Sequence, residues 1–380
     1  MKKSAEVVII GGGISGLSTA YNLANMGCKN VVLLEKESLY SGATGRCAAG
    51  VRQQFGLEAN LRLAMGAYKI LSHLNELLDY ERDIEFKQGG YLWMLTTDEG
   101  VEQAKKNIQL QHNFGIESQL ITPREAQEIV PYLNIEGIKA CTFHQKDGHA
   151  NPFQVSQAYA EAAKRLGVEI NTFTEVIDIK MENNHIVEVV TDKGKIATNK
   201  VLNAAGGFAK YIGEMVGIKL PLKPERHQIL ATEPVEPLLG PMVLSTNVYC
   251  TQEPNGSFLM GYGDPNEPEG VDVSSSWKFM EETAKRICRT LPILSNLKIV
   301  RHWAGTYAMT PDAAPILGSV PEVEGLYLAV GFSGHGFMLG PITGVLMAEH
   351  ILGKETSIPI EKFDVERFKR GELMAEPLVS

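Results

Sequence analysis

The chain has 380 residues, of which 44% are hydrophobic and 21% charged, with a net charge of −9. This size and composition are typical of a globular protein with more than one domain. The negative charge and the lack of any basic tract argue against a nucleic-acid partner. Five widely spaced cysteines without a C-x-x-C pair argue against disulfides and against a cysteine metal site. No apolar run reaches the ~18 residues of a transmembrane segment.

The first forty residues alternate between strand and helix patterns. Residues 7–10 form a short apolar run, 16–26 have helical spacing, and 31–34 form a second apolar run. Short apolar runs around an amphipathic helix indicate two buried parallel strands and their crossover helix.

A glycine motif lies between the first strand and the helix. Gly11, Gly13 and Gly16 are spaced as G-x-G-x-x-G, and Glu35 ends the second strand. Such glycines allow a tight turn, the approach of a pyrophosphate to the backbone, and close packing of helix on strand. The acid can accept hydrogen bonds from a ribose diol. The motif predicts a dinucleotide site, but it serves both NAD and FAD.

Later segments predict the rest of the architecture. We expect helices over 60–78, 98–112, 152–166 and 277–290, a short helix starting after Thr122, and strands over 91–95, 201–204, 228–232, 257–262 and 298–307. The fold class is α/β (α+β overall). A Rossmann-like domain is built from residues 1–85, 145–219 and 318–380. An antiparallel β-rich substrate domain, residues 86–144 and 220–317, is inserted into it.

Three features favour FAD over NAD. Small residues at 41–44 suit a loop around a diphosphate, and the strand at 201–204 leads into Ala205 and Gly206. A third glycine loop precedes the last long helix, where a helix N-terminus can stabilise negative charge on a reduced flavin. An NAD-dependent dehydrogenase would leave the two later loops unexplained.

Three stretches carry a family resemblance: "SGATGRCAAGVRQQF" (41–55), "WAGTYAMTPDAAPILG" (303–318) and "AVGFSGHGFMLGP" (329–341). In these the chain resembles the FAD-dependent oxidoreductases related to D-amino acid oxidase, glycine oxidase and sarcosine oxidase. The nearest pattern is the catalytic β subunit of dye-linked L-proline dehydrogenase and heteromeric sarcosine oxidase. The resemblance implies hydride transfer from the carbon beside an amine nitrogen to flavin N5, which gives an imine.

Two departures from the monomeric sarcosine oxidase pattern refine this expectation. Met338 stands where that relative has a lysine that assists the reaction with oxygen, so we expect an acceptor other than oxygen. Gly305 stands where that relative links its flavin to a cysteine, so we expect noncovalent FAD.

The candidate catalytic residues are Arg52, His335, Met338 and Tyr249. Arg52 matches the carboxylate-binding arginine of the family, although an arginine is usually exposed. His335 either lies near the flavin or orders its loop, and Tyr249 either positions the amine or packs in the core. The candidate cofactor-binding residues are Gly11, Gly13, Ile14, Ser15, Gly16, Glu35, Lys36, Ser41, Thr44, Gly45, Arg46, Val176, Ala205, Gly206, Gly305, Gly331, Gly334, His335, Gly336, Phe337 and Met338.

The resemblance also implies partners. It predicts an electron-accepting α subunit, FMN at the subunit interface and a small amino-acid substrate. The cysteine pattern favours a reducing, cytoplasmic location, with a position peripheral to a membrane through a partner as the alternative. A stand-alone glycine or D-amino acid oxidase or dehydrogenase of the same fold is the main alternative. A non-catalytic flavoprotein is a third reading.

Overall fold

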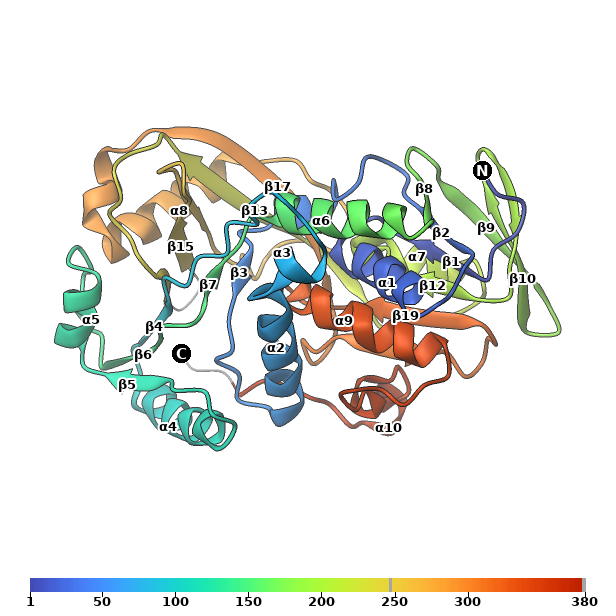
Figure 1. Cartoon of the computed structure of the whole chain (residues 1–380). Helices are drawn as coiled ribbons and strands as arrows, with labels where there is room; N and C mark the ends of the chain where they lie inside the picture. Colours follow the sequence, from blue (N-terminus) through green and yellow to red (C-terminus); the bar gives the residue numbers. More distant parts are fainter. Residues whose placement is uncertain (246–247, 378–380) are drawn as a thin grey trace.

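Two large β-sheets organise the chain, one in each half of the molecule (Figure 1). The computed structural model describes residues 1–245 and 248–377. Residues 246–247 and 378–380, within the predicted segments 220–317 and 318–380, lie outside the described residues. The α/β (α+β overall) fold class is confirmed, whereas the exact domain boundaries stay a prediction.

The first sheet contains the predicted N-terminal strand, helix and strand unit. Its strand order is β18 (Ile316–Ser319), β19 (Leu326–Val330), β12 (Val201–Asn203), β1 (Val7–Ile10), β2 (Val31–Leu34) and β8 (Glu169–Asn171). All neighbours are parallel except β18, which runs antiparallel to β19. The order reverses direction at β1, whose neighbours are β2 and β12.

Alternation along β1 divides the core into two layers. Val7 and Ile9 face a helical layer, whereas Val8 and Ile10 face the opposite core. The helical layer contains four helices: α1 (Ile14–Asn25), α2 (Glu58–Leu71), α6 (Pro152–Arg165) and α9 (Gly336–Ile351). The opposite layer contains three strands and a helix: β9 (Val176–Glu182), β10 (His185–Thr191), β11 (Gly194–Ala197) and α7 (Ala209–Glu214). Each fully buried Ile or Val contributes roughly 1.5–3 kcal/mol.

The single helix predicted over 60–78 is wrong. The chain forms α2 and then the short α3 (Leu74–Leu77), with His73 between them at φ −130° and ψ 19°. Ser72 Oγ donates to the carbonyl of Tyr68 at 2.9 Å. A serine that bonds back to the preceding turn competes with the helical ladder, which favours a break at this place.

The second sheet has eight strands. Their order is β17 (Ile299–Met309), β13 (Lys223–Thr232), β16 (Phe258–Gly261), β15 (Val248–Gln252), β14 (Met242–Ser245), β4 (Tyr91–Leu95), β6 (Ala140–His144) and β5 (Gln119–Ile121). The pairs are antiparallel, apart from the parallel pair β14–β4. The helices α4 (Asp98–Asn113), α5 (Pro123–Ile129) and α8 (Trp277–Thr290) complete this half.

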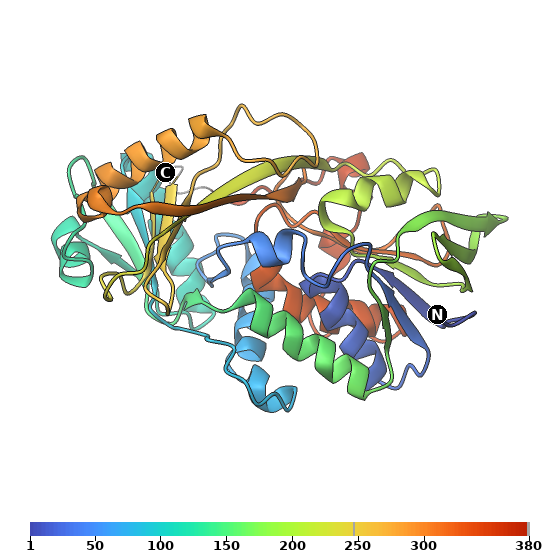
Figure 2. The same cartoon turned by 90° about the horizontal axis from the view of Figure 1, so that it is seen from above.

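Long strands connect the two halves. β13 and β17 pair from Lys223–Met309 to Thr232–Ile299, and Figure 2 shows β17 extending from the eight-stranded sheet toward the other half. β13 begins five residues before the predicted strand 228–232 and includes Pro224. A proline fits there because no strand other than β17 pairs with this stretch of β13, and on its other side the Pro224 carbonyl accepts the N–H of Gly270 at 2.8 Å. Below this junction, β3 (Gly50–Val51) pairs with β7 (Gly148–His149).

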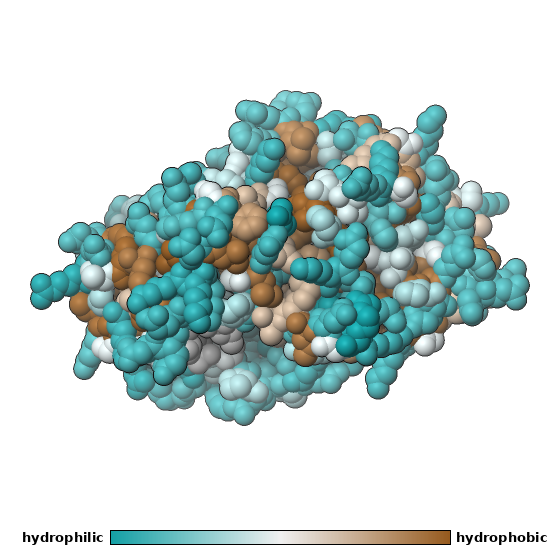
Figure 3. Space-filling view, turned by 90° about the horizontal axis from the view of Figure 1, so that it is seen from below, coloured by the Kyte–Doolittle hydropathy of each residue, from teal (hydrophilic) through white to brown (hydrophobic). Residues whose placement is uncertain are grey.

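The surface is mixed in character. Figure 3 shows mostly hydrophilic side chains on the lower face, with hydrophobic ones near the middle of it. Within residues 1–245 and 248–377, no helix is both long and apolar enough to cross a membrane.

Candidate active site

The predicted cofactor residues meet because they follow neighbouring strands. Gly11 follows β1, Glu35 follows β2, Ala204 follows β12 and Gly331 follows β19. These four strands are adjacent and parallel, so their carboxyl ends share one edge of the sheet. Ligands of open α/β sheets bind at this edge, where the strand order reverses.

Glycine is required by contact at the first loop. A Cβ atom on Gly11 would lie 2.4 Å from the carbonyl oxygen of Ala204, and one on Gly16 would lie 2.0 Å from the carbonyl oxygen of Gly11. Gly11 also has φ +116°, in the region that only glycine adopts readily. Glycine at these two positions therefore lets the loop pack closely against the end of β12 and the start of α1.

Glu35 and Thr44 each accept a hydrogen bond from the backbone of the first glycine loop. The Glu35 carboxylate accepts the N–H of Gly12 through Oε2 and the N–H of Glu37 through Oε1, both at 2.8 Å. Thr44 Oγ1 accepts the N–H of Ile14 at 3.1 Å. Each carboxylate oxygen keeps a lone pair for a ribose hydroxyl.

Two helices begin without side-chain caps. α1 starts after Gly13 and α9 after His335, and neither has an acid in its first turn. The N-terminus of a helix carries about half a positive charge, which suits phosphates or an anionic ring. The residues present therefore fit a dinucleotide such as FAD.

The Arg46 side chain connects the two halves by hydrogen bonds to backbone carbonyls of both. Its Nε donates to the carbonyl of Ser41 at 2.7 Å and its Nη1 to that of Ala304 at 2.9 Å. Trp303 Nε1 donates to the carbonyl of Arg46 at 3.1 Å. A Cβ on Gly305 would lie 3.0 Å from Arg46 Cβ, so Gly305 lets the loop lie against β17.

Arg52 and His335 form a pair. Arg52 Nη2 donates to Nε2 of His335 at 2.9 Å, and Nη1 donates to the carbonyl of Gln54 at 2.9 Å. Burial and the cationic neighbour lower the pKa of His335 to about 3, so the ring is neutral and can accept. Burial also lowers the pKa of Arg52, which still stays charged. Its guanidinium lies 4.3 Å from the centre of the Phe55 ring.

A buried network holds the loop that carries Arg52. The Asp147 side chain is fully buried and accepts the N–H of Gln53 at 2.8 Å and the amide of Gln54 at 3.1 Å. His144 Nδ1 lies 2.9 Å from the same carboxylate, and Thr142 donates to Gln54 at 2.8 Å. Satisfied buried networks of this kind make a loop rigid.

An aromatic row connects the eight-stranded sheet to the third glycine loop. The rings of His227 and Tyr307 stack with their centres 4.4 Å apart, and Tyr249 lies on the row at 5.7 Å from His227. The Tyr249 hydroxyl is 3.1 Å from His227 Nε2. A Cβ on Gly334 would lie 2.7 Å from the Tyr307 ring. The row therefore ends beside the residue that precedes His335.

Burial keeps these polar groups neutral. It lowers the pKa of His227 to about 4 and raises the pKa of Tyr249 well above its ordinary value. It also raises the pKa of Tyr91 and of Tyr307. Arg52 therefore carries a positive charge next to the neutral ring of His335.

The other predicted residues are placed less directly. Met338 and Phe337 are each 7% exposed and belong to the main core, whereas Val176 is buried in the opposite core. Lys36 Nζ lies 3.3 Å from the centre of the Phe208 ring. Ser15 is buried in α1. The contacts of these residues do not test whether they bind the cofactor, so their cofactor role stays a prediction.

Sequence reasoning missed Tyr91, Gln54, Asp147 and Tyr307. Tyr307 could have been found, because it lies two residues after Gly305 and therefore on the same face of its strand. The others depend on the pairing of β4 with β6, which brings together positions about fifty residues apart.

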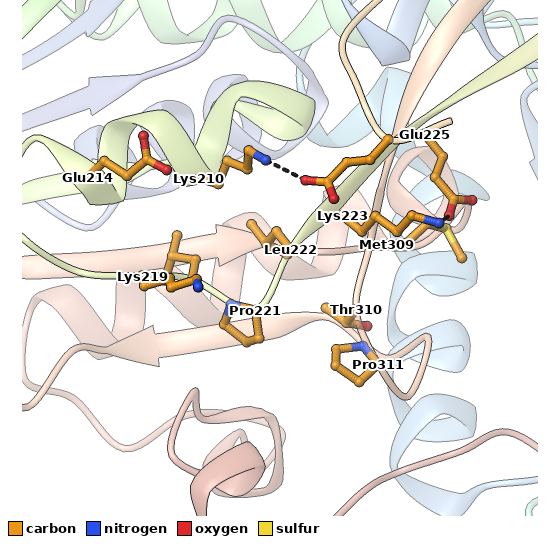
Figure 4. A pocket seen from close by; sticks show the side chains of 12 residues that line it. Lys210, Glu214, Lys219, Pro221, Leu222, Lys223, Glu225, Met309, Thr310 and Pro311 are labelled. Atoms are coloured by element: carbon orange, nitrogen blue, oxygen red, sulfur yellow. Dashed lines mark hydrogen bonds and ion pairs between the residues drawn. The ribbon is translucent and has the colours of Figure 1, made fainter. Parts of the chain in front are cut away.

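A separate hollow of about 530 Å³ contains none of the predicted site residues. Figure 4 shows lysines and glutamates on its walls, where Lys210 pairs with Glu269 and Lys223 with Glu225. Among the described residues, no group of three or more His, Cys, Asp or Glu side chains could hold a metal ion.

Comparisons with known proteins agree with this geometry. The family model described as "DAO: FAD dependent oxidoreductase" matches residues 6–350. The sarcosine oxidase subunit beta of Arthrobacter sp is 30% identical and aligns over 99% of this chain and 94% of its own. That of Rhodobacter capsulatus is 29% identical, over 100% and 92%.

Two solved structures are also similar. The L-proline dehydrogenase from P. horikoshii has a TM-score of 0.93 and 40% identity, covering 98% of this chain and 100% of its own. The glycine oxidase from Geobacillus kaustophilus has a TM-score of 0.88 and 26% identity, covering 96% and 99%.

Proposed function

Because this chain belongs to the DAO family of FAD-dependent oxidoreductases, we propose that it oxidises a proline-like or N-methyl amino acid to an imine. The observation that carries the proposal is the Arg52–His335 pair beside the third glycine loop. The 40% identity to an L-proline dehydrogenase supports the substrate class. The electrons pass to an acceptor other than oxygen, an assignment that rests on Met338.

The cofactor in this proposal is noncovalent FAD. Bound FAD supplies the hydride acceptor. Glu35 would accept hydrogen bonds from its ribose, and the N-termini of α1 and α9 would stabilise its negatively charged groups. Gly305 would offer no nucleophile to its ring. Most of the other predicted cofactor residues lie in these loops, whereas Val176 lies in β9 and Phe337 and Met338 lie in the first turn of α9.

Arg52 binds the substrate carboxylate in this account. A guanidinium has five N–H donors, and Gln54 and His335 accept one each, so donors remain for a paired contact. The neutral His335 holds the plane of the guanidinium without competing for the anion. Tyr249 positions the amine. Its raised pKa keeps the hydroxyl protonated, so it can donate a hydrogen bond to a neutral amine.

A partner subunit belongs to the same proposal. Two relatives carry the name "subunit beta", which supports a multisubunit complex. We assign the partner the role of electron acceptor, with FMN at the interface, on the family resemblance. The five cysteines are free, which supports a reducing, cytoplasmic location.

The alternative is a stand-alone oxidase or dehydrogenase for glycine or a D-amino acid. The observation in its favour is the TM-score of 0.88 to a glycine oxidase. The test measures the turnover of four substrates: L-proline, sarcosine, D-proline and glycine. Each is assayed once with an artificial dye as electron acceptor and once with oxygen. The proposal predicts dye-dependent turnover of proline or sarcosine and slow turnover with oxygen. Fast oxygen consumption with glycine would contradict it.

A further inference from the structure

The segment after α10 (Arg367–Arg370) contacts two parts of the chain next to the candidate site, one at Asp312 and the other at Gly56 and Asn60. In Figure 1 it leaves the six-stranded half and runs past α2 toward α4. The hydrogen bonds of residues 374–377 fix both of its ends.

Its first anchor is a buried ion pair. Arg367 Nε donates to Asp312 Oδ2 at 2.8 Å, and Nη2 donates to Oδ1 at 3.0 Å. The N–H of Met374 donates to the same carboxylate at 3.1 Å. Two residues before Asp312, the N–H of Thr310 donates to Ser333 Oγ at 3.1 Å. The anchor is therefore joined to the third glycine loop.

Its second anchor is Glu376. One carboxylate oxygen accepts the N–H of Gly56, and the other accepts Asn60 Nδ2 at 2.8 Å. Asn107 Nδ2 donates to the carbonyl of Pro377 at 3.4 Å. Gly56 is four residues after Arg52 and follows Phe55, whose ring lies under the guanidinium.

Glu376 lies close enough to influence Arg52. Burial lowers the pKa of Arg52, and the negative charge of Glu376 is among those that oppose this lowering. The space around Gly56 is full, since a Cβ there would lie 2.6 Å from Asn107. A carboxylate that bonds the Gly56 N–H therefore restrains a tightly packed loop.

We propose that Glu376 is a positioning residue for substrate binding. By bonding Gly56 and Asn60 it fixes the loop 52–56, and with it the guanidinium of Arg52, relative to the third glycine loop. The inference rests on the proposed role of Arg52 as carboxylate anchor. Glu376 acts through Arg52, so its loss changes KM rather than kcat.

Three variants separate hydrogen bonding from charge. Glu376→Ala removes both contacts. Glu376→Gln can keep both, because Asn60 Oδ1 lacks a partner and a turned Asn60 amide could accept from the glutamine. Glu372→Ala is the matched control, since Glu372 lies on the same segment, is exposed and pairs with Arg370 at 2.8 Å.

The holoenzyme is assayed with L-proline and sarcosine, and cyclopentanecarboxylate is titrated as a carboxylate that lacks the amine. Glu376→Ala should raise KM and the analogue Kd about tenfold, the equivalent of ~1.4 kcal/mol, with kcat within about twofold. Glu376→Gln should recover most of the loss, and Glu372→Ala should match the wild type. Unchanged KM and Kd in Glu376→Ala, or equal rises in the Ala and Gln variants, would overturn the proposal.

Hydrogen exchange gives a readout that does not depend on turnover. The peptide containing residues 52–60 should exchange faster in Glu376→Ala than in the wild type or Glu372→Ala. Unchanged exchange would overturn the positioning role. Faster exchange in a protein whose flavin no amino acid reduces would contradict the proposed function and leave the contact itself supported.

Discussion

The cofactor side and the substrate side of this site are built in different ways. On the cofactor side, short local motifs place backbone and glycine at the ends of β1, β2, β12 and β19. On the substrate side, single side chains come from β4, β13, β15, β17 and the loop after β3. The difference teaches that an added carbon at Gly11 or Gly16 meets backbone atoms within 2.4 Å, whereas a side chain on the substrate side can be changed without moving the backbone.

The largest expected effect is on the cofactor side. Gly16→Ala places a Cβ 2.0 Å from the carbonyl oxygen of Gly11. Such overpacking costs about 1–3 kcal/mol, so we expect FAD binding to weaken by up to about 100-fold. The flavin-to-protein ratio and the equilibrium Kd for FAD measure this.

Gly240→Ala is the control for that variant, because no atom lies within 4 Å of the added carbon. It should bind FAD like the wild type. Circular dichroism of Gly16→Ala distinguishes loss of FAD from loss of the fold. Normal FAD affinity in Gly16→Ala would contradict the claim that close packing at Gly16 is needed for FAD binding.

The second effect isolates the substrate carboxylate. Arg52→Ala leaves that carboxylate without its charged partner, and breaking a buried pair costs about 3–5 kcal/mol. We expect KM for L-proline to rise by at least about 100-fold. Pyrrolidine, which has the amine but no carboxylate, should be oxidised with nearly unchanged constants. A similar loss for both compounds would show that Arg52 is not the anchor.

A smaller effect is expected at the aromatic row. Tyr249→Phe removes the hydroxyl that lies 3.1 Å from His227 Nε2 and keeps the ring. The loss of one neutral hydrogen bond, about 1 kcal/mol, predicts a fall in kcat/KM of about fivefold. FAD content should not change. A loss of FAD in this variant would show that a substrate-side residue also contributes to FAD binding, and would contradict the distinction between the two sides.

The smallest effect concerns pH and stability. His227 has a pKa of about 4 when folded and its ordinary value of 6.5 when unfolded. The unfolded state therefore binds more protons between these values, and stability falls as the pH falls from 6.5 toward 4. At pH 5.5 this loss is about 1.4 kcal/mol for one histidine.

Urea unfolding of the wild type and of His227→Gln at pH 7.5 and 5.5 measures that loss. The stability of the glutamine variant should change less between the two pH values. Equal changes in both proteins would show that His227 does not stay neutral in the folded state.

The sequence was most informative where structure is local. The place of the first glycine motif between β1 and α1, that of Glu35 after β2, and the bounds of β4 and α8 could be predicted because each depends on residues close in sequence. The partners of Arg52 could not, since Asp147 reaches its loop only through long-range pairing of strands. The break at His73 was missed because the apolar spacing continues through it.

The most direct test of the central claim is the visible spectrum of the purified protein during anaerobic addition of L-proline, sarcosine, D-proline and glycine. The account predicts a flavin band that proline or sarcosine bleaches and that glycine leaves unchanged. A flavin band that none of the four bleaches would contradict the proposed substrate class. A protein that binds no flavin even after addition of FAD would contradict the whole account.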